Sequence, residues 1–166
     1  MTYDIDEATA HAAKHPHEIF LINLIFNHIL LFVAFISASS LQHWVILVPV
    51  ISFAILGYTL WRARRSLRID PWFVKCHWQI AARRSMIFIL MLGIMAAAIV
   101  VILLVSGGDP KPQHYAIGGA AVLPTMVTVL ALIIMESESL HQARSGILPR
   151  WVEERFPEGT LEPVGE

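Results

Sequence analysis

Four long apolar stretches are the feature that most constrains how this chain can fold. They cover about residues 19–37, 44–61, 86–105 and 115–135. Each is close to the roughly 20 residues that an α-helix needs to cross the hydrocarbon core of a bilayer. Charged residues make up only 15% of the 166 residues, whereas soluble domains contain about 25%. The sequence therefore predicts an all-α membrane protein with four spans.

A basic segment between the second and third stretches predicts the orientation of the bundle. Residues 61–84 contain seven of the twelve Lys and Arg residues, and the two other links, 37–43 and 106–112, contain a single basic residue, Lys111. Loops rich in Lys and Arg stay on the cytoplasmic side of a membrane. We therefore expect an up-down-up-down four-helix bundle in a bacterial inner membrane, with both termini in the cytoplasm.

The basic segment itself is expected to form an extended helical hairpin over residues 62–85, on the cytoplasmic side. Asp70 followed by Pro71 is typical of a helix N-cap and the first helical residue after it. The helix that follows has an apolar side and a basic side, which suits the headgroup layer of a membrane. The residues expected to bind lipid or a partner are Arg62, Arg64, Arg65, Arg68, Trp72, Lys75, Trp78, Arg83 and Arg84.

The two terminal segments are polar. Residues 1–17 lack the basic region that begins a signal peptide, so we take the first apolar stretch as a retained span within a membrane domain of residues 18–138. Asp4 or Asp6 is placed to cap a short helix that Pro16 would end. Residues 139–166 are expected to form a cytoplasmic tail, disordered from residue 157 onward.

Polar side chains in the first span are candidates for a functional site. Asn23, Asn27 and Ser37 fall within one narrow sector of a helix, which is the kind of stripe that faces other helices rather than lipid. His28 lies in the middle of the span, where an ionisable residue is by default a functional hypothesis. The alternative is a neutral histidine that hydrogen-bonds to a neighbouring helix.

Small residues in the third and fourth spans predict close helix contacts. Gly93 and Ala97 are four positions apart, and Gly118 and Gly119 open the fourth span. Such residues allow two helix backbones to approach closely in a membrane.

No cofactor is required by the sequence, but histidines leave metal or haem b binding open. His11 and His15 share one face of a helix, and His43 and His114 lie at the predicted external surface, so these four are the metal candidates. A haem b would need two axial ligands, which a pair of His28 residues across a symmetric interface would supply. No nucleophile and base are arranged for catalysis, which argues against an enzyme.

These observations leave three functional hypotheses. The first is an interaction or accessory subunit, or a homo-oligomeric membrane scaffold. The second is a homo-oligomeric channel or transporter whose pore is lined by Asn23, Asn27 and His28. The third is a haem- or metal-binding redox anchor. The expected partners are the bilayer, anionic headgroups at the cytoplasmic face, and other copies or other membrane subunits. Nucleic acid is not expected, because the basic charge sits in a loop between two spans.

Overall fold

The computed structural model describes residues 2–107, 109 and 111–157, and these contain helices and no named strand. The elements are α1 (Glu7–Ile22), the π-helix η1 (Asn23–Leu31), α2 (Phe32–Ser37), the 3-10 helix η2 (Ser39–Ile46), α3 (Leu47–Ile69), α4 (Trp72–Val105), α5 (Pro112–Arg144) and α6 (Arg150–Arg155). Four helical segments, Glu7–Ser37, Ser39–Ile69, Trp72–Val105 and Pro112–Arg144, are long and apolar enough to cross a membrane. The expectation of an all-α protein with four such helices is confirmed. The tail expected to be disordered falls, from residue 158, outside the described residues.

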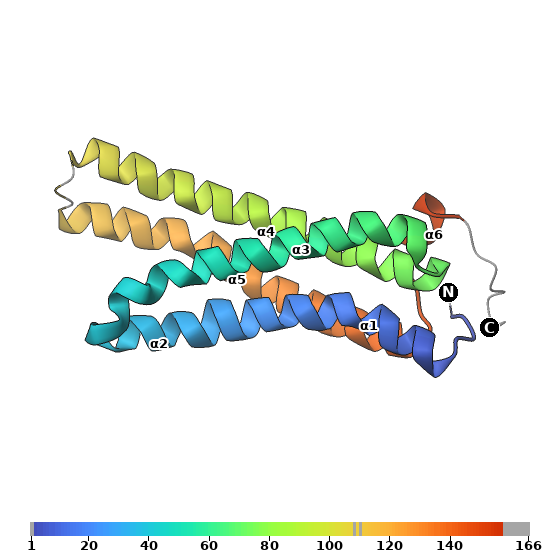
Figure 1. Ribbon diagram of the computed structural model, residues 1–166. Helices are drawn as coiled ribbons and strands as arrows, with labels where there is room; N and C mark the ends of the chain where they lie inside the picture. Colours follow the sequence, from blue (N-terminus) through green and yellow to red (C-terminus); the bar gives the residue numbers. More distant parts are fainter. Residues whose placement is uncertain (1, 108, 110, 158–166) are drawn as a thin grey trace.

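The four long segments form two helical hairpins (Figure 1). The first hairpin consists of α1, η1 and α2 followed by η2 and α3, and the second consists of α4 and α5. The beginning of α1, the turn from α3 to α4 and the end of α5 lie at one end of the molecule, which we call the proximal end (Figure 1). The η2 helix, the end of α4 and the start of α5 lie at the opposite, distal end.

The core is confined to the proximal half, where the two hairpins pack against each other. α1 contacts both α4 and α5, and α3 contacts α4. Phe20 of α1, Leu24 of η1, Leu56 of α3 and Phe88 of α4 are fully buried in one cluster between the hairpins. A second cluster, nearer the proximal end, joins side chains of α4 to those of α1, α3 and α6. Its largest fully buried members are Phe73, Trp78, Ile80, Leu148 and Val152.

The distal half is open. No described side chain in residues 28–47 or 93–124 is buried. α2 packs mainly against η1 and η2 of its own hairpin, and the two hairpins diverge toward the distal end (Figure 1). The molecule is therefore packed at one end and splayed at the other.

Three local expectations can be compared directly with the structure. Asp6 caps α1, because its Oδ1 accepts a hydrogen bond from the Thr9 backbone N–H at 2.7 Å. The prediction that Pro16 ends this helix is wrong: Pro16 is buried inside α1, where packing against α4 and α5 outweighs the loss of one backbone hydrogen bond. Asp70 is not an N-cap either, since Pro71 takes that position and the Asp70 carboxylate binds Arg62 instead.

The chain segments before α1 and after α5 close the proximal end. The Tyr3 backbone N–H donates to the Gly146 carbonyl at 2.8 Å, and Thr2 forms an isolated antiparallel bridge with Ile147. Gly146 has φ = +71°, and a Cβ at this position would lie 2.2 Å from the Tyr3 carbonyl oxygen. Both observations require glycine here.

Candidate functional site

The most unusual group of side chains is a buried polar cluster in the proximal half, formed by His17, His77, Arg84 and Glu136. We call it the proximal cluster. His17 comes from α1, His77 and Arg84 from α4, and Glu136 from α5. His17 Nδ1 lies 2.6 Å from Glu136 Oε2, and His17 Nε2 lies 2.9 Å from His77 Nδ1. The other oxygen of the Glu136 carboxylate, Oε1, accepts from Arg84 Nη1 at 3.1 Å.

Burial makes these contacts energetically important. His17, His77 and Glu136 have no solvent-exposed surface, and the Arg84 side chain is 13% exposed. Arg84 also donates to the Met135 carbonyl at 2.8 Å. A buried carboxylate must be paired or become neutral, and here one arginine and one histidine contact its two oxygens. The cluster thus ties α1, α4 and α5 together.

Two proton arrangements satisfy the contacts around an ionised Glu136. If His17 is protonated on both nitrogens, it donates to Glu136 and to His77 Nδ1. If His17 carries a proton on Nδ1 alone, its Nε2 accepts from His77 Nδ1–H. The two arrangements differ by one proton. Both nitrogens of His17 are occupied in either case, so neither is free to bind a metal ion.

A second polar cluster lies where η1 packs against α3, and we call it the η1 cluster. Asn27 Nδ2 donates to Asn23 Oδ1 at 3.1 Å and to the Val48 carbonyl at 2.9 Å. Asn23 Nδ2 in turn donates to Ser52 Oγ at 3.1 Å, and His28 Nε2 lies 2.8 Å from the same oxygen. The His28 ring also packs edge-on against Phe88, with 4.9 Å between centroids. These hydrogen bonds all lie within a single chain, and Asn27 Oδ1 is buried without a hydrogen-bond partner among the described residues.

The polar stripe expected along the first span is only partly present. Asn23 and Asn27 are buried, but Ser37 is exposed at the end of α2 and does not join the η1 cluster. Ser37 lies in the distal half, where no described side chain of residues 28–47 is buried. The stripe also crosses the π-helix over Asn23–Leu31, whose hydrogen bonds join residues five apart rather than four.

Most residues of the basic segment make contacts within the chain. Arg62 forms a bidentate pair with Asp70, with Nη1–Oδ2 and Nη2–Oδ1 distances of 2.6 and 3.0 Å. Burial of the Asp70 carboxyl opposes its ionisation, but hydrogen bonds from Arg62 and Ser66 and the charges of Arg62 and Arg65 outweigh that and hold its pKa below the usual value. The pair joins the end of α3 to the turn before α4.

The tryptophans expected at the headgroup layer are also engaged. Trp78 is 2% exposed and lies beneath the Arg62 guanidinium, which is 4.9 Å from the ring centroid. Trp72 Nε1 donates to the Phe156 carbonyl at 2.6 Å. Arg83 covers Trp151, at 4.6 Å. Of the residues expected to bind lipid or a partner, those that remain exposed at the end of α3 are Arg64, Arg65 and Arg68. Lys75 of α4 has an interaction partner.

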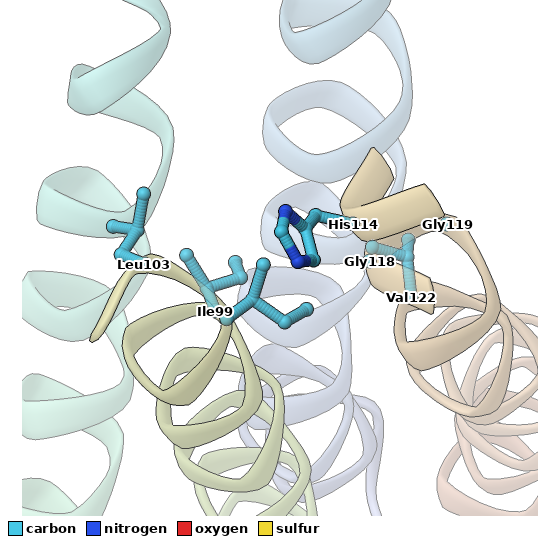
Figure 2. Close-up of a pocket in the computed structure, with 7 residues that line it drawn as sticks. Ile99, Leu103, His114, Gly118, Gly119 and Val122 are labelled. Carbon is cyan, nitrogen blue, oxygen red and sulfur yellow. The ribbon is translucent and has the colours of Figure 1, made fainter. Parts of the chain in front are cut away.

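The four histidines considered as metal ligands are not brought together. His11 and His15 lie one turn apart on α1, and His43 packs beside Trp44 in η2. His114 lines a shallow apolar pocket of about 270 Å³ between the distal ends of α4 and α5 (Figure 2). Among the described residues, no three His, Cys, Asp or Glu side chains are placed to hold a metal ion.

The small residues of α4 and α5 are largely uncovered. A Cβ added at Gly93 or Gly119 would meet no atom within 4 Å, and one at Gly118 would meet only the tip of Ile102 at 3.7 Å. Ala97 is exposed as well. Apart from Gly118 beside Ile102, these positions make no close helix contact within the described part of the chain, although their spacing is typical of such contacts.

No protein-family model, curated protein or solved structure matches this chain. The function has to be inferred from the packing and chemistry described above.

Sequence reasoning missed the proximal cluster. In the sequence, Glu136 stands beside Glu138 and His141, and His17 stands beside the other N-terminal histidines. The contacts of His17 span 60 and 119 residues of sequence, so no local spacing reveals them. The signal available in the sequence was the position of a carboxylate at the end of an apolar stretch. If such a group is buried, it requires partners from other helices.

Proposed function

We propose that this protein is a homo-oligomeric membrane scaffold whose distal half is completed by a second copy of the chain. The observation that carries the proposal is the contrast between the halves. The proximal half is held by a buried core and the proximal cluster, whereas the distal half has no buried side chain among the described residues.

The helix face that packs against the other hairpin in the proximal half continues uncovered into the distal half. On α4, Leu92 is 5% exposed, while Ile99 and Leu103, seven and eleven residues further on, are 42% and 50% exposed. Residues at these spacings share one face of an α-helix. Ile99 and Leu103 line an open pocket beside α5 of their own hairpin, so this face of α4 is only partly covered in the distal half.

A second copy is the partner that this surface fits. Each hairpin has an aliphatic face in the distal half that no other helix covers fully. An isologous dimer brings such faces together across a two-fold axis. Gly93 and Gly119 offer open backbone at this level, and helix association in membranes relies on such close packing. The α4–α5 hairpin of one copy would thereby pack against the distal half of the other.

The test is the oligomeric state of the wild-type protein and of a Gly119→Leu variant, measured by single-molecule photobleaching in lipid bilayers. A Cβ at this position would meet no atom within 4 Å in the described chain, so the variant should keep its thermal stability. It should lose at least about tenfold in dimer affinity, which is a modest effect for a helix interface. Gly57→Leu is the matched control, because Gly57 is equally open but lies on α3 in the proximal half. A monomeric wild type, or a Gly119→Leu protein that dimerises normally, would overturn the proposal.

We also propose that the bundle lies up-down-up-down in a bacterial inner membrane, with the proximal end in the cytoplasm. The support is the segregation of charge: residues 61–84 contain seven of the twelve Lys and Arg residues, and such segments resist translocation. A reporter active only in the cytoplasm should be active when fused at Ile69 and silent when fused within residues 106–112. The opposite result would reverse the orientation.

The contacts of the η1 cluster favour the scaffold over a pore or a haem site. A pore formed between copies would need Asn23 and Asn27 to face a lumen, but both are buried and bonded within one chain. A haem shared by two chains would need a ring nitrogen of His28, and Nε2 of that ring is taken up by Ser52.

A further inference from the structure

A pocket of about 560 Å³, lined by both polar and apolar side chains, opens near the proximal end, between α1 and the turn that joins α3 to α4. His11 and His15 line it from α1, Tyr58 and Arg62 from α3, and the Trp78 side chain from α4. We propose that this pocket binds the phosphate headgroup of an anionic phospholipid. The site lies within one chain, so the inference does not depend on self-association.

The side chains around the pocket are held in place before any ligand arrives. Trp78 contacts three of them: the Arg62 guanidinium lies 4.9 Å from its ring, and the His15 and Tyr58 rings lie edge-on at 6.3 and 6.5 Å. Asp70 fixes the plane of Arg62 through two hydrogen bonds. A preorganised site loses less entropy on binding than a flexible one.

The chemistry of the lining fits a phosphate. A guanidinium has five N–H donors, and Asp70 accepts from only two nitrogens of Arg62. An arginine with unused N–H donors is well suited to bind phosphate, because its planar guanidinium matches the geometry of the phosphate oxygens. Asp70 is the one acid among the described residues that line the pocket, and its charge is balanced by Arg62. Two histidines, His11 and His15, add further polar ring nitrogens to the lining.

The position of the pocket favours a lipid over a soluble phosphate ester. Tyr58 and Trp61 are 44% and 54% exposed on α3 beside the pocket, and such aromatic side chains gather at the headgroup level of a membrane. Part of the lining is apolar, from Ala8, Ala12 and Val74. This surface suits the glycerol backbone and the start of the acyl chains of a membrane lipid.

The experiment measures lipid binding to the purified full-length protein by native mass spectrometry, with phosphatidylglycerol as the probe and phosphatidylcholine and glycerol phosphate as comparisons. We expect phosphatidylglycerol to bind at least about tenfold more tightly than either, and Arg62→Gln to weaken it by about tenfold through loss of charge-assisted hydrogen bonds. Arg68→Gln is the control, because Arg68 is exposed on α3 and does not line the pocket.

A second variant keeps the test valid if Arg62→Gln fails to fold. The double variant His11→Gln/His15→Gln changes two exposed side chains. It should weaken phosphatidylglycerol binding, because glutamine cannot carry the positive charge that an imidazole can carry beside a phosphate. Wild-type affinity in both pocket variants, or equal losses in Arg68→Gln, would refute the site. Glycerol phosphate that binds as tightly as phosphatidylglycerol would refute the lipid as its ligand.

Discussion

Replacing Glu136 by Gln should destabilise the protein more than a change of one atom suggests. The substitution keeps the shape and both polar positions of the side chain but removes its charge. Arg84 Nη1 is 3.1 Å from Oε1 and His17 Nδ1 is 2.6 Å from Oε2. Removing one member of a buried ion pair costs about 3–5 kcal/mol, because the other charge stays buried. The Arg84 side chain is 13% exposed and retains some access to water, so we expect the lower end, about 3 kcal/mol.

A cost of this size is a factor of roughly a hundred in the unfolding equilibrium constant. Equilibrium unfolding in mixed micelles of a mild detergent and dodecyl sulfate measures it directly. The matched control is Glu138→Gln, two residues along the same helix, where the exposed carboxylate bonds only to Gln142 in the described residues. Changes at such surface positions stay within about 0.5 kcal/mol.

The double variant Glu136→Gln/Arg84→Gln separates pairing from simple loss of a side chain. If the unpaired guanidinium causes the cost, removing it as well should restore part of the stability, with a coupling energy of about 1–3 kcal/mol. Two results would refute the reasoning: a Glu136→Gln variant within about 0.5 kcal/mol of wild type, or a double variant that loses the full sum of the two single changes.

Two further predictions concern glycine positions and the Asp70 pair. Gly146→Ala should lower stability by more than about 2 kcal/mol, because it adds a clash with the Tyr3 backbone to the cost of φ > 0. Gly107→Ala should cost only about 1 kcal/mol, because Gly107 has φ = +62° but no atom near its Cβ position. Equal losses of stability in thermal unfolding of the two variants would contradict this. The lowered pKa of Asp70 means that its stabilising contribution is complete above the ordinary value of about 3.9 and is lost as pH falls through the lower folded value. Asp70→Asn should therefore reduce the acid-dependent loss of melting temperature, and an unchanged pH profile would count against that role.

The number and approximate extent of the long helices could be predicted from the sequence, because each depends on a local property. An apolar stretch of about 20 residues is sufficient to identify a candidate span. The cap at Asp6 was also predictable, since a cap bonds to a residue three positions away. Pro16 shows the limit of such reasoning. Its local effect is to interrupt a helix, but α1 packs along α4 and α5, and tertiary packing decided the outcome.

The polar clusters could not be predicted in the same way. The sequence singles out His28 as an ionisable side chain in a span, and its contact with Ser52 agrees with the alternative of a histidine bonded to a neighbouring helix. Its neighbours were harder to foresee, because a π-helix changes which residues share a face. The sequence presents the basic segment as one surface, whereas pairing with Asp70, Glu136 and Trp151 divides it among separate contacts. Such pairings depend on how the helices are placed relative to one another.

The contact between His17 and Glu136 has a consequence for how the protein is made. Their side chains are 119 residues apart in the sequence, and a ribosome adds about 5–20 residues per second. Glu136 is therefore synthesised roughly 6 to 24 seconds after His17, whose ring it contacts in the folded protein. During that interval His17 lacks its partner, and the proximal core cannot close until the last long helix has been synthesised. A chain truncated before Glu136 should accordingly be recognised by membrane quality control as an unfinished protein.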